Sequence, residues 1–508
     1  MNSIALTDRS FTRYVRLAAA IVFSCACSVA VGEESSLPNI VLIVADDMGY
    51  GDVGCYNLQS KIPTPNMDRL AREGIRFTDA HSADSVCTPS RYAMMTGRYC
   101  WRTQLKRGVL FNYEPPLIEK GRMTVASLLR QNGYTTGMVG KWHLGLGFTA
   151  RQGKQVDFDR PLPWPGKPNP DRQISESVDF SVPVFGGPND LGFDYAFYTA
   201  GCSTDQEPFC FIENRVFLDM TNATYRHPRG SWRSGMAASK WINETVDVSF
   251  TDKAVNFITR SHQKIPNKPF FLYLPLSAPH SPHLVPDFAR GKSRAGVRGD
   301  MVWLFDSCVG RIVKILDELN LTDNTLLIVT SDNGPLKGSL KPGAPEGTAK
   351  ISNGHKSVGE LRGYKGRIFE GGHRIPFIAK WPKRIPVASI SDQPLCLIDL
   401  LATCAAIVDA KLPNTAGEDS VNMLLAVRGM KKKEPIRESI VHSSGHGVFS
   451  VRNGKWKIIF GGVKGQLYDL KVDPYETTDV VDKHPEVVEE LTRLMEKYKN
   501  EGRSAPLR

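Results

Sequence analysis

The sequence predicts an α/β fold in which a large, mixed and mostly parallel sheet is flanked by helices, followed by a smaller C-terminal α+β subdomain. Short apolar runs alternate with helical patterns over most of the 508 residues, as a parallel sheet with crossover helices requires. Beyond about residue 435 the texture changes to alternation of polar and apolar residues, which is typical of antiparallel strands.

Four apolar runs have the length of strands, at residues 39–45, 136–140, 270–274 and 325–330, and each stops at polar residues. The first is continuously apolar, which suits a strand buried on both faces of a parallel sheet. Ligands bind outside the carboxyl edge of open α/β sheets, so the groups that follow these runs predict a site. These groups are Asp46, Asp47, Lys141, His143, His280, Asp332 and Asn333.

Between the strands, residues 64–74 predict a helix with Thr64 as its cap, a proline at its first position and Gly74 at its end. Two segments rich in proline and glycine, 151–190 and 337–354, predict long loops around the rim of the site.

A charged stretch with a proline at 431–435 separates the α/β pattern from the alternating polar and apolar pattern that follows it. We therefore expect a catalytic domain at 33–434 and a C-terminal α+β subdomain at 435–508. Within the latter, Asn453-Gly454 predicts a hairpin turn between two strands. A third strand is expected in 465–479, and Pro485–Lys499 reads as an amphipathic helix.

The N-terminus has the organisation of a secretory signal, which we assign to residues 1–32. Three arginines precede the apolar run 17–32, which ends in small residues. An uncleaved membrane anchor is the alternative, but the run is shorter than the roughly 20 residues that span a bilayer. No later segment reaches transmembrane length, so we expect no membrane span after signal removal and an exported enzyme, periplasmic or secreted.

The chain is basic. Loss of Asp8 with Arg9, Arg13 and Arg16 lowers the formal net charge from +11 to +9. In an exported protein this charge suits a polyanionic or sulfated substrate better than nucleic acid, although a solvated basic surface is the commoner explanation of such a charge. Nothing resembles a nucleic-acid-binding motif, so no nucleic-acid partner is expected.

The stretch SVCTPSRYAMMTGRY places Cys87 where a loop enters a predicted helix, with Pro89 suited to the first helical position. A helix N-terminus would favour an anionic group on residue 87 and an anionic substrate beside it, whereas a structural cysteine near a cap is the alternative. Of the ten cysteines, two leave with the signal, and the remaining eight lack metal-finger spacing. Cys202 and Cys210 are candidates for a disulfide, but the connectivity is open.

Two pairs of oxygen donors, Asp46-Asp47 and Asp332-Asn333, follow two of the predicted strands. Hard oxygen ligands favour Ca²⁺ or Mg²⁺ over zinc. Either pair alone is more often a loop cap, but two pairs at matching strand ends favour a metal site.

These elements together resemble the formylglycine-dependent sulfatases of the alkaline phosphatase superfamily, and most of the chain takes part in the resemblance. The motifs, in family order, are PNIVLIVADDMGYGD, TPNMDRLAREG, CTPSRYAMMTGRY, GMVGKWHLG, FFLYLPLSAPHSPH, TLLIVTSDNG and GYKGRIFEGGHRIPFI. In this family the C-x-P-S-R core directs a maturation enzyme to convert the cysteine to formylglycine, which implies that Cys87 is a precursor and not a thiol nucleophile. The first two motifs look like the branch of arylsulfatase A and N-acetylgalactosamine-6-sulfatase.

The resemblance also implies a role for each candidate residue. Calcium, with magnesium less favoured, would be bound by residue 87 together with Asp46, Asp47, Asp332 and Asn333. Arg91 would hold the residue-87 diol, Lys141 would bind sulfate oxygens, and His143 would act as base on the diol. His280, as general acid, and Lys365 would contact the sulfate and its bridging oxygen. His283, His355 and His373 are weaker candidates, the last two only as substrate-pocket residues.

We therefore expect a sulfuric ester hydrolase that acts on a sulfated carbohydrate and requires a formylglycine-generating partner. A phosphate or phosphonate ester hydrolase of the same superfamily is an alternative, although such enzymes depart in the lysine and histidine elements. A non-catalytic binder of sulfated glycans is a third reading, disfavoured because every expected polar position is filled.

Overall fold

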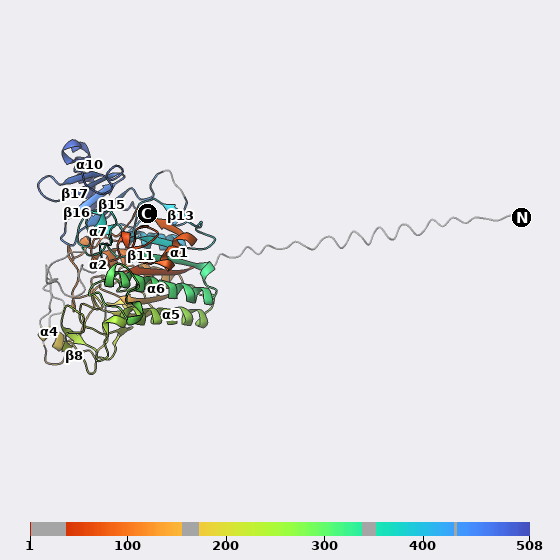
Figure 1. Ribbon diagram of the computed structural model, residues 1–508, viewed down its shortest axis with the longest axis vertical. Helices are drawn as coiled ribbons and strands as arrows, with labels where there is room; N and C mark the ends of the chain where they lie inside the picture. Colours follow the sequence, from red (N-terminus) through yellow and green to blue (C-terminus); the bar gives the residue numbers. More distant parts are fainter. Residues whose placement is uncertain (2–36, 155–171, 338–351, 431–433) are drawn as a thin grey trace. The chain divides into compact units, whose positions relative to one another are not determined.

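A mixed sheet of ten strands forms the centre of the part of the chain that the structure describes (Figure 1). This computed structural model describes Met1 and residues 37–154, 172–337, 352–430 and 434–508. The expected signal at 1–32, residues 431–433 and much of the two expected loops lie outside the described residues. In spatial order the strands are β13 (Ser389–Ser391), β2 (Ile75–Phe77), β12 (Phe377–Lys380), β11 (Thr325–Ser331), β1 (Asn39–Ala45), β10 (Phe270–Pro275), β4 (Thr135–Lys141), β5 (Tyr195–Thr199), β6 (Ile212–Glu213) and β7 (Val216–Phe217).

The five central strands, β11, β1, β10, β4 and β5, are parallel, and antiparallel strands flank them on both sides. This confirms the predicted mixed, mostly parallel sheet. All seven residues of β1 are buried, which explains its uninterrupted apolar sequence. In the register of β1 and β11, Ala45 pairs with Ser331, so both strands end at the same level of the sheet.

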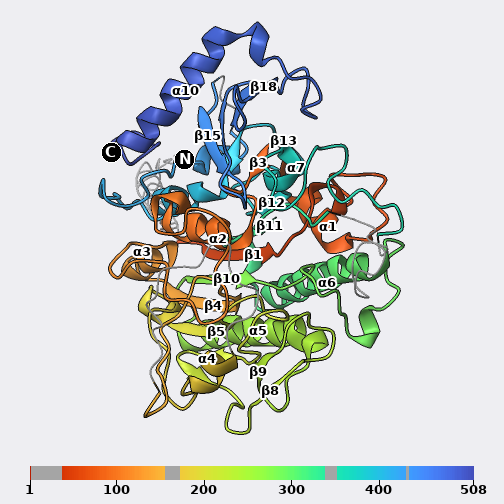
Figure 2. The same ribbon diagram turned by 90° about the vertical axis from the view of Figure 1, so that its left-hand side faces the viewer.

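Helices cover both faces of this sheet (Figure 2). On one side α5 (Val246–Lys264) packs on β4 and β10, α1 (Pro65–Glu73) packs on β12, and α6 (Gly296–Glu318) contacts both helices. On the other, α3 (Val125–Gln131) packs on β4 and contacts α2 (Cys87–Thr96) and α8 (Leu400–Ile407). Thr64 and Gly74 bound α1 as predicted. In the described part of the chain, the other α-helices before residue 434 are α4 (Arg172–Ser177), α7 (Glu370–His373) and α9 (Leu424–Val427). Two small sheets complete this region. One pairs β3 (Ala80–His81) with β14 (Leu395–Cys396), and the other pairs β8 (Thr224–Arg226) with β9 (Gly235–Ala237).

Two predictions about segments with a cysteine are wrong. The helix α2 begins at Cys87, so Pro89 is its third residue and not its first. Proline is tolerated there because the first four N–H groups of a helix have no intrahelical acceptor. Cys202 and Cys210 are free thiols and do not form the candidate disulfide, since Cys202 faces two histidines while Cys210 lies in the main core.

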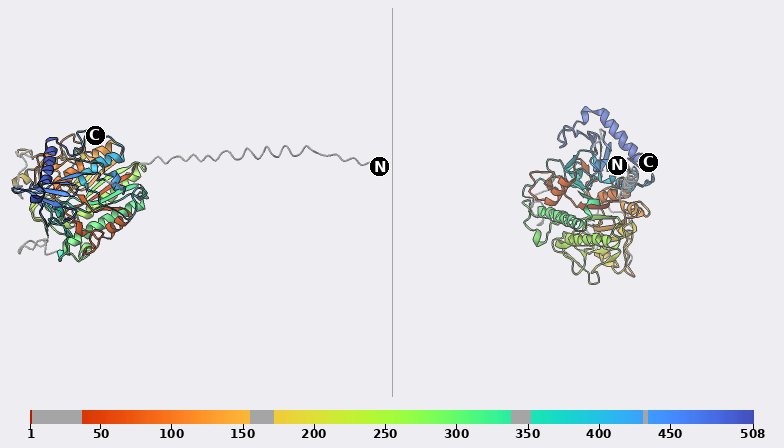
Figure 3. Two further views of the ribbon diagram at one scale, coloured as in Figure 1. Left: turned by 90° about the horizontal axis from the view of Figure 1, so that it is seen from above. Right: turned by 90° about the vertical axis from the view of Figure 1, so that its right-hand side faces the viewer.

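The C-terminal region forms an antiparallel sheet of four strands, as the alternating sequence predicts. A hairpin joins β16 and β17 as predicted, but its turn is Gly454-Lys455 and not Asn453-Gly454, because Asn453 pairs with Trp456. The helix α10 (Pro485–Asn500) packs on both strands (Figure 3, in blue). The strands are β15 (Ser439–Ser443), β16 (Phe449–Asn453), β17 (Trp456–Phe460) and β18 (Gln466–Asp469). Leu37–Arg508 form one compact unit, and the boundary at residue 434 stays a prediction. No described helix is long and apolar enough to cross a bilayer.

The strand β15 packs against the loop that precedes Cys87. His442 Nδ1 lies 3.0 Å from Ser82 O, and Ser85 N donates to Ser443 O at 3.1 Å. Apolar residues of α2 and of the C-terminal sheet also share one buried cluster. The C-terminal sheet therefore fixes the position of residue 87, although it lies more than 350 residues away in sequence.

Three buried histidines meet where β15 packs against β3 and α7. The rings of His373 and His442 stack at 3.7 Å, and His81 Nδ1 lies 3.0 Å from His373 Nδ1. Lys457 Nζ lies 3.0 Å from His373 Nε2 and 2.9 Å from the Glu370 carboxylate. Burial lowers the pKa of all three histidines, so each is neutral in the folded chain. His373 thus belongs to this cluster and does not line a substrate pocket.

We expect this cluster to make folding acid-sensitive. Because the folded pKa values are lowered, only the unfolded chain takes up these protons as the pH falls below about 6.5, so stability is lost there by up to about 1.4 kcal/mol per pH unit for each histidine. Urea unfolding between pH 5 and 8 should show a shallower decline for His442→Gln than for the wild type.

The matched control is His227→Gln, which removes an exposed histidine and should leave the pH profile unchanged. Parallel profiles for the wild type and His442→Gln would contradict the expectation.

Candidate active site

The carboxyl ends of β1 and β11 place four oxygen-bearing side chains together. Asp46 and Asp47 follow β1, and Asp332 and Asn333 follow β11. Asp47 has a positive φ of 71°, and its N–H donates to Asp332 Oδ1 at 3.2 Å. Asn333 Nδ2 donates to Asp47 Oδ1 at 2.7 Å. All four are at most 1% exposed, so the structure brings the two predicted donor pairs into one buried cluster.

Three cationic side chains surround these carboxylates. Lys141 Nζ, at the end of β4, lies 2.5 Å from Asp46 Oδ2, and Lys365 Nζ lies 2.8 Å from Asp47 Oδ2. Arg91 Nε donates to Asp332 Oδ2 at 2.9 Å. A buried charge is stable only beside an opposite charge, so carboxylates and cations require one another here.

The backbone lets β4 and β10 deliver their side chains close together. Gly140 precedes Lys141 with φ of 137°, and a Cβ atom on it would lie 1.9 Å from Pro275 O at the end of β10. Only glycine fits this approach.

The pKa values of the two carboxylates Asp46 and Asp332 are shifted in opposite directions. Burial alone would raise the pKa of Asp46, but Lys141, His280 and Arg91 outweigh it and lower that pKa. Burial and repulsion from Asp46 raise the pKa of Asp332 to about 6. Asp332 is therefore the carboxylate that gains most from a further cation.

The cluster fits a hard divalent cation. Asn333 Oδ1 is buried and accepts no hydrogen bond from the described protein atoms, which is the state of an oxygen able to bind a metal. Asp46, Asp47, Cys87 and His280 each offer an atom within 4.8 Å of the others. Together with Asp332 and Asn333, four of these six residues offer carboxylate or amide oxygens, which favour Ca²⁺ or Mg²⁺.

Residue 87 lies at the first position of α2, against the cluster. Cys87 Sγ donates to Asp46 Oδ1 at 3.3 Å. The hydrogen bond with Cys202, burial and the Asp46 carboxylate raise the pKa of the Cys87 thiol well above its usual value. The helix N-terminus thus does not make Cys87 a thiolate, contrary to the expectation from its position, because the neighbouring groups dominate.

Two histidines approach residue 87 with fixed tautomers. His143 Nε2 lies 2.8 Å from Leu110 O, and a carbonyl only accepts, so Nε2 carries the proton and Nδ1 a lone pair. Likewise His280 Nδ1 lies 2.5 Å from Ser281 O. Burial lowers the pKa of His143. For His280, burial and Lys365 lower the pKa, but the negative charge of Cys202, Asp46 and Asp47 outweighs them and raises it to about 9.

A cavity of about 290 Å³ opens onto these groups. Its lining includes Cys87, His143, Cys202, His280, Lys365 and His446. His446 follows β15, so the C-terminal subdomain contributes directly to the pocket. The Cys202 thiol lies 3.9 Å from His143 Nδ1 and 3.8 Å from His280 Nε2.

Sequence reasoning missed Cys202 as a site residue, and it assigned no role to His446 or Arg298. Arg298 Nη2 donates to Asp47 O at 3.0 Å and to Asp52 Oδ2 at 2.6 Å, and His355 Nε2 lies 2.9 Å from Asp52 Oδ1. His355 therefore contacts Asp52, which holds the Arg298 that bonds to Asp47 O, and it does not line the catalytic pocket. The Asp52 carboxylate next to the Asp46-Asp47 pair was a signal for such a partner, whereas nothing in the sequence near Arg298 was.

The chain matches known proteins over most of its length. A family model described as Sulfatase matches residues 38–410. An N-acetylgalactosamine-6-O-sulfatase of Bacteroides thetaiotaomicron is 34% identical, over 92% of this chain and 94% of that protein. Human arylsulfatase A is 33% identical, over 86% of this chain and 77% of its own length. A solved structure from work on glycosaminoglycan metabolism by Bacteroides thetaiotaomicron superposes with a TM-score of 0.78 and 32% identity, and covers 92% of this chain and 100% of its own.

We expect Ca²⁺ to stabilise the folded chain through this cluster. A ligand that binds only the folded state at 100 times its Kd adds about 2.7 kcal/mol to the free energy of unfolding. Asn333→Ala removes the buried oxygen that accepts no hydrogen bond and should weaken calcium affinity by about 10- to 100-fold.

Calorimetric titration and thermal unfolding with Ca²⁺ or a chelator measure both effects. Asn500→Ala, at the exposed end of α10, is the control and should bind like the wild type. Equal calcium affinity of Asn333→Ala and the wild type would exclude this oxygen as a ligand.

Proposed function

The chain belongs to the sulfatase family, whose members hydrolyse sulfuric esters, and from this premise we propose that it removes sulfate from a sulfated carbohydrate at the cluster around residue 87. The observation that carries the proposal is one pocket lined by Cys87, His280 and Lys365. Asp47 lies beside Lys365 and His280, and Lys141 is buried against the adjacent Asp46. Cations and a proton donor facing a small cavity suit a tetrahedral anion attached to a leaving alcohol.

We infer that Cys87 is the precursor of formylglycine, made by a maturation enzyme that reads CTPSR. Support comes from the family match and from the environment of the thiol, which opposes its ionisation. A formylglycine at this position would supply a hydrated aldehyde, with one hydroxyl as the nucleophile that displaces the alcohol at sulfur and a second whose deprotonation would re-form the aldehyde and release sulfate.

The residues around position 87 would accept a proton and bind the sulfate oxygens. His143 presents the Nδ1 lone pair and is suited to accept a proton from the residue-87 side chain. Lys141 and Lys365 are held near the pocket by Asp46 and Asp47, where they would bind sulfate oxygens. Arg91 Nη1 donates to Lys141 O at 3.0 Å and ties this strand end to α2.

His280 is the proposed general acid. Its Nδ1 proton is engaged by Ser281 O, so protonation leaves an Nε2–H that points into the pocket near Asp47, at 3.8 Å. Such a group would protonate the bridging oxygen as the alcohol leaves. A calcium ion bound by Asp46, Asp47, Asp332, Asn333 and residue 87 would supply Lewis-acid polarisation of the sulfate and offset its charge.

The proposed substrate is a sulfated glycan with 6-sulfated N-acetylgalactosamine. It rests on the relative of that name at 34% identity and on the formal net charge of +11. We further propose export to the periplasm or beyond, on the basis of the signal-like residues 1–32.

Peptide mass spectrometry across residue 87 tests the precursor role. Protein co-produced with a formylglycine-generating enzyme should show the mass decrease of a thiol-to-aldehyde conversion and should release sulfate from an aryl sulfate. Cys87→Ala should fold and release none. Sulfate release by fully unconverted Cys87 would refute the formylglycine assignment. Conversion without release of sulfate, but with release of phosphate from an aryl phosphate or phosphonate ester, would support the alternative superfamily activity.

The acid role of His280 predicts a dependence on the leaving group. His280→Asn should lower kcat/KM by about 10²- to 10⁴-fold for esters of poor leaving groups such as sugar alcohols. The loss should be much smaller for an activated nitrophenyl sulfate, whose oxygen needs no proton. A uniform loss across leaving groups would argue that His280 binds sulfate and does not transfer the proton.

A further inference from the structure

A second cavity of about 570 Å³ lies outside the catalytic pocket and shares no lining residue with it. Its walls are the segment 50–61, the segment 354–361 and Tyr475 of the C-terminal subdomain. This volume falls in the range of about 300 to 1,000 Å³ that small-molecule sites occupy.

The walls of this cleft are held by hydrogen bonds. Gly51 N donates to Ser357 O at 2.7 Å, which joins the two segments at the floor. The Tyr56 hydroxyl donates to Phe377 O at 2.7 Å and accepts from Phe377 N at 3.0 Å, which fixes its ring to β12. Asn57 Nδ2 donates to Gly51 O at 2.9 Å. The cleft is therefore preformed, so a ligand would not have to order its walls.

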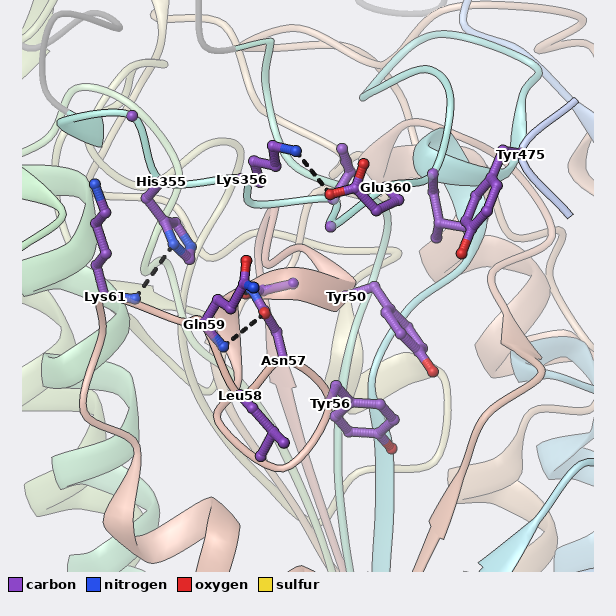
Figure 4. A pocket seen from close by; sticks show the side chains of 15 residues that line it. Tyr50, Tyr56, Asn57, Leu58, Gln59, Lys61, His355, Lys356, Glu360 and Tyr475 are labelled. Carbon is purple, nitrogen blue, oxygen red and sulfur yellow. Dashed lines mark hydrogen bonds and ion pairs between the residues drawn. The ribbon is translucent and has the colours of Figure 1, made fainter. Parts of the chain in front are cut away.

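The lining combines aromatic faces with polar groups. Figure 4 shows Tyr50, Tyr56 and Tyr475 on one side of the cleft and Lys61 with His355 on the other. Tyr475 is 46% exposed and Leu58 is 98% exposed, so apolar surface is offered directly to solvent at this cleft. Amides of Asn57 and Gln59 lie between the two sides.

Positive charge adds to this lining. Lys61 Nζ donates to Asn353 O at 2.6 Å, and an ammonium has three donors, so two remain for a ligand. Lys356 pairs with Glu360 at 2.7 Å across an exposed turn. Lysines outnumber acids in the cleft by two to one, which favours an anionic ligand.

We propose that this cleft binds a saccharide unit of a sulfated glycan chain whose reacting unit occupies the catalytic pocket. The C–H face of a pyranose ring packs on exposed tyrosine rings, its hydroxyls bond to amides, and its sulfate pairs with an ammonium. An apolar metabolite would leave the Lys61 ammonium without an anion.

The position of the cleft suits a long chain substrate. Its first wall begins three residues after Asp47, and its second ends four residues before Lys365. Both walls are thus extensions of the segments that carry catalytic groups. Through the Ser357 hydroxyl, Arg298 also bonds to the second wall at 2.8 Å while it bonds to Asp47 O. Glycan binding in the cleft would add affinity for polymers without changing the chemistry on a small ester.

The inference takes its substrate class from the proposed function, and the test separates the two. Isothermal titration with chondroitin 6-sulfate oligosaccharides, on a Cys87→Ala background that cannot turn over, measures binding alone. Tyr475→Ala should weaken affinity by about three- to tenfold, and Lys356→Gln by about two- to fivefold with strong dependence on salt. Kinetics of matured enzyme should show the same losses in kcat/KM for the oligosaccharides and none for 4-nitrophenyl sulfate.

Two matched controls guard against general effects. Phe288→Ala removes an aromatic ring that is 52% exposed outside the cleft, and Lys314→Gln breaks an exposed i,i+4 pair with Glu318 on α6. Both should bind like the parent, and thermal unfolding verifies that every variant folds. Unchanged affinity in both cleft variants would overturn the inference even if the enzyme releases sulfate. Tyr475-dependent binding by a matured enzyme that releases no sulfate would uphold the cleft and refute the proposed function.

Discussion

The buried pairing of Asp46 and Asp47 with Lys141 and Lys365 is the interaction on which the rest of the site depends. Neither carboxylate is stable in this interior without a cation, and neither ammonium is stable without an anion. The two aspartates follow β1, whereas each lysine comes from another segment. Lys141 is the last residue of β4, and β1 and β4 lie on either side of β10. Sheet order therefore determines which charges meet, and the charges in turn hold the carboxyl ends of these strands together.

Residues outside the pocket keep this arrangement in place. Arg298 of α6 donates to the backbone of Asp47 and is itself held by Asp52, which also contacts His355. From the opposite side, β15 bonds to the loop before Cys87. The C-terminal sheet is thus part of the catalytic apparatus, because it positions residue 87 and brings His446 to the pocket. His355 also lines the second cleft, and Arg298 bonds to Ser357 in its wall, so the two cavities share these supporting residues.

Most of the fold and the main candidate residues could be predicted from local sequence. The four apolar runs became β1, β4, β10 and β11 with ends within one residue or so of the expected ones, because burial on both faces demands unbroken apolar sequence. The predicted hairpin formed, but one residue later, with Gly454-Lys455 as its turn, because Asn453 pairs with Trp456 at the end of β16. Cys202 and Arg298 could not be assigned, because the partners of their side chains lie 59 or more residues away and neither sits in a pattern with local meaning.

The sequence by itself determined the alternation of strands and helices, the identity of the polar groups at the strand ends and the motif around Cys87. These depend on periodicity and on residue types within short windows. Only the tertiary structure decided that Pro89 is the third residue of α2, that Cys202 forms no disulfide and lies beside two histidines, and that His373 belongs to a buried cluster. The physical reason is that protonation, pairing and burial depend on the neighbours that a group meets in space, and most of those neighbours come from distant parts of the chain.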